Sequence, residues 1–171
     1  IECIVRGYLA GSGWKEYLKS KTVCSLPLPE GLMESSKLPE PLFTPSSKEE
    51  GGKHDENISF EKAAVRVGKE TAGRLREISV ELYKKVSGYA LSRGIILADT
   101  KLEFGFYDGK LILIDEIFTP DSSRFWEVEK YKEGESQDSL DKQYVRDYLE
   151  KIKWDKSSPA PELPSEVVEK T

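Results

Sequence analysis

Residues 97–126 restrict the fold of this chain more than any other part of its sequence. They predict two strands joined by a tight turn, because an Asp-Gly pair of the kind that favours a two-residue type I′ connection separates two strand-like stretches. The first strand carries Asp99, Lys101 and Glu103 at two-residue steps, so these side chains share one face of the strand. The sequence therefore predicts an antiparallel hairpin with a charged face.

The charged face has two interpretations. Carboxylates clustered beside a lysine, with Arg124 shortly after the return strand, suit a site that handles a metal ion and phosphate. Oxygen ligands without a neighbouring Cys or His indicate Mg²⁺ or Mn²⁺ rather than zinc. The alternative is a solvated sheet face whose charges form cross-strand ion pairs.

The register of the hairpin decides which carboxylates act together. A strict two-residue turn places Glu103 opposite Ile114 and puts Asp115 on the other face. Asp115 joins Glu103 only if the return strand bulges or twists strongly near its end. A metal site formed by both carboxylates therefore predicts an irregular return strand.

Composition and charge limit the class of protein. With 171 residues and 37% hydrophobic content, the chain is long enough for one domain with a core. The formal net charge of −5 argues against broad binding to nucleic acid or to an anionic membrane, so anionic ligands need local cations. The sequence has no signal-peptide pattern and no apolar run near the ~20 residues of a membrane span. Cys3 and Cys24 are interpreted as reduced, small hydrophobic residues of a cytoplasmic protein.

The remaining patterns predict an α+β fold, with helices packed on a mostly antiparallel sheet. Because the chain opens at Ile1 inside an alternating strand pattern, we expect it to be part of a larger protein. Residues 21–57 are rich in proline and contain no credible long element. The other expected elements are a strand at 1–9, a turn at 10–13, helices at 14–20, from 59, at 70–93 and at 140–152, and a Pro/Ser-rich tail at 153–171 that leads into a truncated terminal helix. The domain itself is expected to span residues 1–152.

The longest predicted helix, residues 70–93, has one apolar stripe at three- and four-residue steps. This stripe is expected to be buried and consists of Leu75, Ile78, Leu82, Val86, Tyr89 and Ala90. Gly94 stands where a left-handed glycine ends a helix.

Two further clusters lie in predicted loops. Arg6 and Ser12 flank a glycine turn before a helix, where small residues and unpaired N–H groups let an anion approach, although such a turn also occurs without any ligand. Lys48 and neighbouring hydroxyls suit a phosphate or carboxylate, and His54 lies in a polar stretch rather than on an apolar face. A solvated loop is the alternative for this second cluster.

Five sequence blocks in this order resemble the SAICAR synthetase family of purine biosynthesis. They are ECIVRGYLAGSGWKEY, LPEPLFTPSSKEEGGKHDENIS, LADTKLEFG, LIDEIFTPDSSRFW and DKQYVRDYLE. Together they cover roughly residues 1–152, with Ser47 at a position where the family commonly has threonine. The resemblance implies the second, substrate-binding lobe of a two-lobed fold related to protein kinases and ATP-grasp enzymes. Its partner, an N-terminal ATP-binding lobe with a glycine-rich nucleotide cradle, is expected to be missing from this chain.

The resemblance also implies an activity, an ATP-dependent carbon–nitrogen ligation that requires Mg²⁺. ATP phosphorylates the carboxylate of carboxyaminoimidazole ribonucleotide, and the amine of L-aspartate then attacks the acyl phosphate to form SAICAR. Two alternatives are an isolated ribonucleotide-binding lobe that is inert without its partner lobe, and a protein-kinase-like phosphotransferase. The latter is disfavoured because the sequence lacks His-Arg-Asp and Asp-Phe-Gly motifs.

Residue roles follow from the positions that match the family's motifs. Glu103 and Asp115 resemble metal ligands that bridge Mg²⁺ to the nucleotide phosphates, and Lys101 resembles the catalytic cation beside the nucleotide. Asp99 is the second catalytic candidate, on the imidazole or ribose side of the substrate. The residues expected to bind substrates are Arg6, Ser12, Asp121, Ser123 and Arg124 for the ribonucleotide, and Lys48, His54 and Asp55 in a loop whose expected ligand is L-aspartate.

Overall fold

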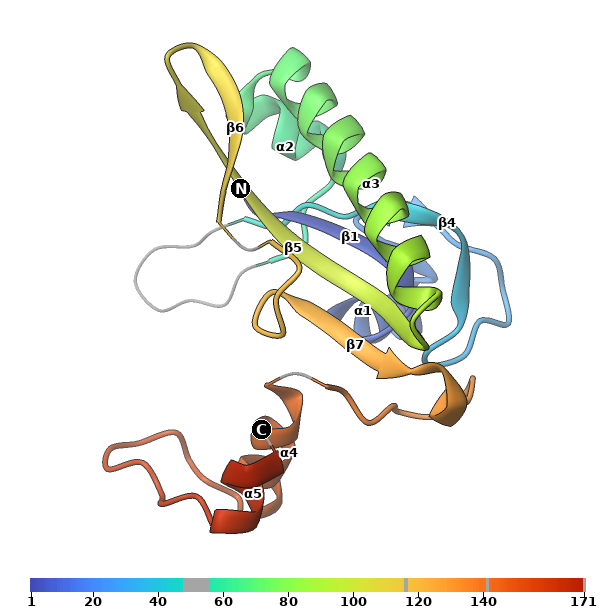
Figure 1. The fold of residues 1–171 in the computed structure, drawn as a ribbon. Coiled ribbons are helices and arrows are strands. Elements are labelled where there is room, and N and C mark those ends of the chain that lie inside the picture. The colour runs from blue at the N-terminus through green and yellow to red at the C-terminus, as the bar shows by residue number, and fades with distance from the viewer. Residues whose placement is uncertain (48–55, 116, 141, 171) are drawn as a thin grey trace.

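The computed structural model describes residues 1–47, 56–115, 117–140 and 142–170 and places an antiparallel sheet at the centre of the fold (Figure 1). The predicted α+β class is confirmed. The sheet strands are β1 (Cys3–Tyr8), β4 (Lys37–Phe43), β5 (Ile95–Tyr107), β6 (Lys110–Asp115) and β7 (Ser123–Glu127), and β2 (Thr22–Val23) pairs with β3 (Leu26–Pro27) in a separate ribbon.

The long strand β5 organises the sheet. Its first part pairs with β1 on one edge and with β7 on the other, whereas its last part pairs, among the described residues, with β6 only. The β5–β6 hairpin therefore extends beyond the body of the sheet (Figure 1). Because side chains alternate along a strand, one face of β5 carries the charged series that the sequence predicts.

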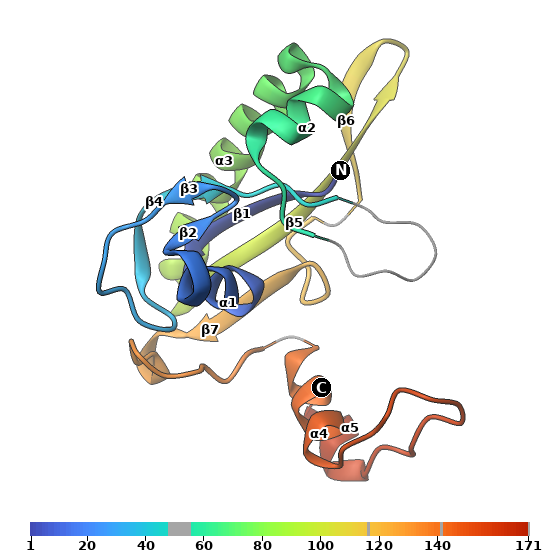
Figure 2. The ribbon, with the colours of Figure 1, turned by 180° about the vertical axis from the view of Figure 1, so that it is seen from behind.

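Helices cover both faces of the sheet. The helices of the described residues are α1 (Gly11–Ser20), α2 (Phe60–Val67), α3 (Lys69–Leu91), α4 (Gln143–Lys151) and α5 (Ser165–Lys170), with a 3₁₀ turn at Val128–Lys130. The helix α3 lies across one face and α1 lies on the other (Figure 2). Gly94 has a positive φ of 78°, as predicted, and the hydroxyl of Ser59 accepts a hydrogen bond from the Lys62 N–H at the start of α2.

The buried face of α3 differs from the predicted stripe. Leu75 is buried as expected, but Tyr89 is 63% exposed, and the buried row continues through Ser79 and Tyr83. The hydroxyl of Tyr83 donates a hydrogen bond of 2.6 Å to the Leu97 carbonyl, so this tyrosine packs inward with its polar atom satisfied. The prediction for Tyr89 was wrong because apolar spacing alone does not reveal which tyrosine finds a partner.

The expectation of no long element in residues 21–57 was also wrong, because β4 lies within that range. This strand contains Pro39 and Pro41. It sits at the edge of the sheet and has an irregular register with β1, which is where a strand tolerates residues without an N–H.

The C-terminal segment contains two helices in contact with one another, α4 and α5, below the sheet (Figure 1). Both lie where the sequence predicts helix. The domain boundary after residue 152 remains a prediction. Across the described residues, none of the helices has the length and apolar character needed to span a membrane.

Candidate functional site

One polar pocket of about 250 Å³ brings together most of the predicted site residues. The pocket lies over the charged face of β5 and receives residues from β1, α1, β7 and α4. The predicted residues that line it are Arg6, Ser12, Asp99, Lys101, Asp121, Ser123 and Arg124. The hydroxyl-bearing residues Thr100 and Ser122 and the cations Lys142 and Arg146 also line it, although the sequence analysis did not select them.

Asp99 lies at the centre of an arginine pair because of the strand register. It is directly opposite Arg6 on β1 and opposite Arg124 on β7, so one carboxylate faces a guanidinium on each side. Its Oδ2 accepts hydrogen bonds from Arg6 Nη1 at 3.1 Å and from Arg124 Nη1 at 3.0 Å. Two positive charges thus share one negative charge, which leaves an excess of positive charge at this wall of the pocket.

Arg6 is the buried member of this cluster, with 3% of its surface exposed. Its Nε donates to Thr44 Oγ1 at 3.0 Å, and its Nη2 donates to Ser12 Oγ at 2.9 Å. Burial lowers the pKa of Arg6, and the Asp99 carboxylate opposes that shift. Neutral hydroxyl acceptors therefore hold the guanidinium without adding further negative charge.

The glycine turn leaves space for the side chains of Arg6 and Arg124. Gly11 has a positive φ of 54°, and a Cβ placed on it would lie 2.8 Å from Nη1 of Arg124. A Cβ on Gly13 would lie 3.2 Å from Cδ of Arg6. The sequence analysis predicted that small residues here admit an anion, and the structure shows that they also make room for the two arginine side chains.

Lys101 lies on the same strand face, two residues from Asp99. Its Nζ is 2.9 Å from Oε1 of Glu2, a buried carboxylate that the sequence analysis did not select. The interpretation of this face as cross-strand ion pairs is thus correct in part, but the pairs that Arg6 and Lys101 form with their partners are buried or half-buried rather than solvated.

Lys142 and Arg146 bring a third group of cations to the pocket from the start of α4. Lys142 Nζ donates to Asp121 Oδ1 at 2.7 Å and lowers the pKa of that carboxyl, and the charges of Lys101 and Arg146 act in the same direction. Their four-residue spacing puts Lys142 and Arg146 on one helix face. The sequence signal that could have identified both residues was this four-residue spacing, within a block that resembles the family.

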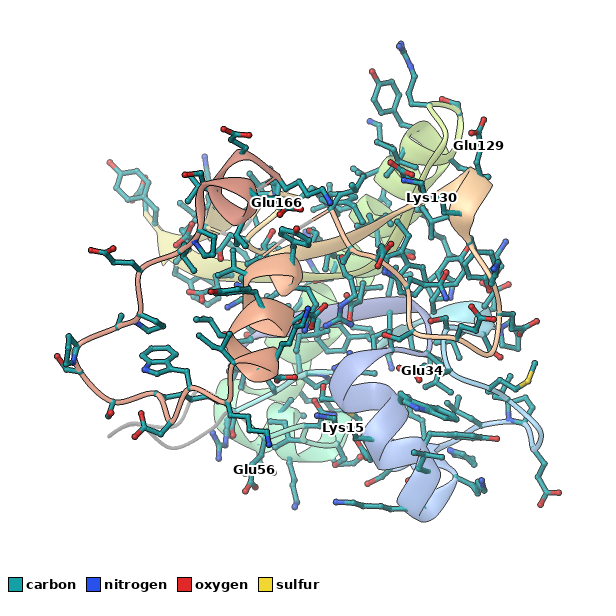
Figure 3. The ribbon with its side chains drawn as sticks, turned by 90° about the horizontal axis from the view of Figure 1, so that it is seen from below. Lys15, Glu34, Glu56, Glu129, Lys130 and Glu166 are labelled. Carbon is teal, nitrogen blue, oxygen red and sulfur yellow. The ribbon has the colours of Figure 1, made fainter. Side chains whose placement is uncertain are left out.

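The same helix also faces α1 across a second polar cavity of about 280 Å³. Lys15 and Glu34 line it from the α1 side (Figure 3). Gln143 and Asp147 line it from α4. Arg124 lines both this cavity and the main pocket.

The predicted metal ligands lie next to the pocket rather than in its wall. The strands pair Glu103 with Asp115 but pair Phe104 with Leu113, so Ile114 is an extra residue in β6. This bulge is the irregularity that a shared Glu103–Asp115 site requires. Asp121 connects the two regions, because it lines the main pocket and also an adjoining cavity of about 340 Å³ that Asp115 lines.

The two carboxylates fit a magnesium–nucleotide complex better than a self-contained metal cage. Among the described residues, no group of three or more His, Cys, Asp or Glu side chains is placed to hold a metal ion. Mg²⁺ is commonly bound by one or two carboxylates together with substrate phosphates and water. Glu103 and Asp115 have the hard oxygen donors and the opposed register that such a complex needs.

The loop residues Lys48, His54 and Asp55 lie outside the described residues. The two residues on either side of that segment are joined, because the Ser47 N–H donates to the Glu56 carbonyl at 2.8 Å. The predicted contact of this loop with L-aspartate therefore remains a prediction.

Comparisons with known proteins identify relatives of this chain. Over 171 residues, the chain is 63% identical to the phosphoribosylaminoimidazole-succinocarboxamide synthase of Thermodesulfovibrio yellowstonii, and it covers 58% of that protein. The solved structure of the SAICAR synthase from Saccharomyces cerevisiae complexed with SAICAR is 49% identical, with a TM-score of 0.87 over 98% of this chain and 55% of that one. A SAICAR synthetase in complex with ADP is 31% identical, with a TM-score of 0.66 over 95% of this chain and 64% of that one.

The chain thus spans 58% of the length of this curated relative, while the relative matches all of the chain. The family model described as SAICAR synthetase matches residues 1–161. The pocket residues of β1, β5, β7 and α4 all fall within that match. On this evidence, the chain belongs to the SAICAR synthetase family.

Proposed function

We propose that this chain forms the ribonucleotide-binding part of a ligase that joins L-aspartate to carboxyaminoimidazole ribonucleotide, with ATP as co-substrate, to give SAICAR in purine biosynthesis. The arginine pair on Asp99 is the observation that carries this proposal. The names of its relatives support the reaction, and the SAICAR and ADP complexes of related structures support the two ligand classes. A cytoplasmic location and a separate ATP-binding lobe remain predictions.

The charge of the pocket supports an anionic substrate. Among its lining residues are five cations and two carboxylates, although the whole chain has a net charge of −5. The carboxylates are Asp99 and Asp121. A ribonucleotide that carries both a carboxylate and a phosphate monoester matches such a pocket, because arginine binds both groups through paired N–H donors. The local cations can therefore bind an anionic substrate although the net charge of the chain is negative.

The order of residues along the pocket suggests how the ribonucleotide lies. Lys101 is next to Glu103 on the strand face, whereas Lys142 precedes α4 and Arg146 belongs to that helix. We place the reacting carboxylate towards Lys101, because phosphoryl transfer must occur near the proposed metal ligands. The ribose phosphate then lies near Arg124, Lys142 and Arg146.

The reaction needs activation of that carboxylate before an amide forms. An oxygen of the substrate carboxylate attacks the γ-phosphorus of ATP, the bond to ADP breaks, and an acyl phosphate results. The nitrogen of L-aspartate then attacks the acyl carbon, inorganic phosphate leaves, and the nitrogen loses a proton. Positioning and charge neutralisation are the main catalytic devices in such transfers.

The residues of this chain supply both devices. Arg6 and Arg124 orient the ribonucleotide through a fixed pair of guanidiniums, and Lys101 places a positive charge beside the transferred phosphoryl group. Mg²⁺ held by Glu103 and Asp115 would neutralise charge on the nucleotide phosphates. The bulge at Ile114 supports the sharing of one ion by those two carboxylates.

A second candidate treats the 171-residue chain by itself as a binding module that holds the ribonucleotide without turnover. Calorimetric titration with carboxyaminoimidazole ribonucleotide tests binding, and phosphate release that depends on L-aspartate tests turnover. We expect the chain to bind the ribonucleotide without releasing phosphate. Turnover by the chain alone would exclude the second candidate, and failure of the full-length protein to turn over would contradict the proposed reaction.

A further inference from the structure

A buried carboxylate next to the pocket has no part in the proposed reaction. Glu2 precedes β1 and is only 5% exposed. Its Oε1 lies 2.9 Å from Lys101 Nζ, and its Oε2 accepts a hydrogen bond of 2.8 Å from Ser46 Oγ. A buried carboxylate is unfavourable unless it is paired and hydrogen-bonded, and here each oxygen has a partner.

The backbone fixes this carboxylate as well. The Glu2 N–H donates to the Ser46 carbonyl at 3.0 Å, and the Ser46 N–H donates to the Glu2 carbonyl at 3.1 Å. Lys101 is opposite Ile4 in the sheet, two residues along β1, so Glu2 reaches it along a diagonal of the same face. The position of Glu2 is therefore set by the sheet and not by Lys101.

The two partners differ in freedom. The Lys101 side chain is 27% exposed and ends a flexible four-carbon stem, whereas the Glu2 side chain is 6% exposed and held from two directions. The bond to Glu2 restricts the positions that the ammonium samples at the edge of the pocket. The ammonium has three N–H donors, and the bond to Glu2 uses one of them, so this bond does not prevent Lys101 from also contacting a phosphoryl oxygen.

We infer that Glu2 is the positioning residue for Lys101, and that it holds the ammonium where the transferred phosphoryl group meets the pocket. This inference rests on the proposed function, which assigns Lys101 to that group. Glu2 acts through Lys101 and does not itself touch the substrate. A purely structural Glu2 would instead stabilise the contact between β1 and Ser46, whatever residue stands at position 101.

A double-variant cycle in the full-length protein separates these two roles, with Glu2→Gln and Lys101→Met made singly and together. Glu2→Gln keeps the volume of the side chain but removes its charge. We expect turnover to fall by about 10- to 100-fold, the range seen when a supporting side chain is lost, with the KM for ribonucleotide changed less than about threefold. In the Lys101→Met background the same change should add less than about a twofold loss, because its target is already absent.

Glu40→Gln is the matched control. Glu40 also pairs with a lysine, Lys84 Nζ at 3.1 Å, but both side chains are exposed and neither lines the pocket. Its turnover should equal that of the unchanged protein. If Glu2→Gln proves unable to fold in thermal melts, Ser46→Ala replaces it, since it removes only the hydroxyl that holds Oε2. Ser46→Ala should cause a smaller loss of turnover than Glu2→Gln, and this loss should likewise disappear in the Lys101→Met background.

The outcomes distinguish the inference from the proposed function. Loss of turnover in Lys101→Met without any loss in Glu2→Gln would overturn the inference alone. An equal loss from Glu2→Gln in both backgrounds would also overturn it, because that pattern belongs to a structural residue. Full activity in Lys101→Met would overturn the proposed role of Lys101, and the inference with it.

Discussion

The two ends of β5 present their charges in opposite ways. The inner end, around Asp99 and Lys101, is paired on both edges, and its charged side chains are bound to partners on neighbouring strands. Among the described residues, the outer end around Glu103 pairs with β6, and Asp115 opposite is exposed. One strand thus carries a prearranged anion pocket at one end and an exposed carboxylate opposite Glu103 at the other.

The difference indicates that the two ends of β5 have different functions. A pocket that orients a ribonucleotide benefits from side chains fixed before the ligand arrives, because less freedom is lost on binding. Two carboxylates that meet a magnesium–nucleotide complex need only be near one another, since the phosphates and water complete the coordination. We therefore expect changes at the arginine pair on Asp99 to affect folding and ribonucleotide binding, and changes at Lys101, Glu103 and Asp115, beside the proposed phosphoryl transfer, to affect turnover.

Asp99→Asn should have the largest effect on stability. The change leaves two guanidiniums facing one another without their shared carboxylate, and breaking a buried ion pair costs about 3–5 kcal/mol of unfolding free energy. Since Arg124 is partly exposed, we expect the lower end of that range. Asp115→Asn is the matched change at the outer end and should alter the unfolding free energy by less than about 0.5 kcal/mol. Equal losses in urea titrations of the two variants would remove the proposed contrast.

Arg124→Ala should mainly weaken ribonucleotide binding. Hydrogen bonds to charged groups contribute about 1.5–3 kcal/mol, so affinity should fall by roughly 10- to 150-fold in calorimetric titrations. Arg93→Ala is a suitable control, because Arg93 is exposed near the end of α3 and does not line the pocket. Unchanged affinity in Arg124→Ala would show that the ribonucleotide does not contact the arginine pair.

Alkaline pH should destabilise the fold through two buried thiols. Burial raises the pKa of Cys3 to about 11 and that of Cys24 to about 12. Stability is complete below the pKa of an unfolded thiol, about 8.5, and declines as pH rises towards the folded values. Each thiol should cost up to about 1.4 kcal/mol per pH unit in that window. Chemical unfolding between pH 8 and 10 should show a shallower decline in Cys24→Ala, and an identical slope would contradict this account.

Much of the site was predictable because strand alternation and turn chemistry are local. The positions of Asp99, Lys101 and Glu103 on one face follow from a two-residue period, and the need for a bulge near Asp115 follows from the turn. The structure contains that bulge at Ile114. The family resemblance added Arg124 to the pocket, where it is now found.

Other features depended on contacts between distant parts of the chain. Glu2 contacts Lys101 only because β1 lies beside β5, and its second oxygen is bonded to the distant Ser46. Neither contact can be read from the local sequence. Lys142, just before α4, reaches Asp121 from 21 residues further along the chain, and no local pattern predicts that contact. The strand β4 was missed because its prolines argue against a strand, and only its position at the sheet edge permits them.

The most direct test of the division along β5 is the full-length Glu103→Gln variant, with ribonucleotide affinity and turnover measured on the same preparation. We predict that the affinity stays within about twofold, because Glu103 does not line the anion pocket. Turnover should fall at least about tenfold at fixed magnesium concentration. Unchanged turnover would contradict the metal assignment, and a parallel loss of ribonucleotide affinity would contradict the separation of the two ends.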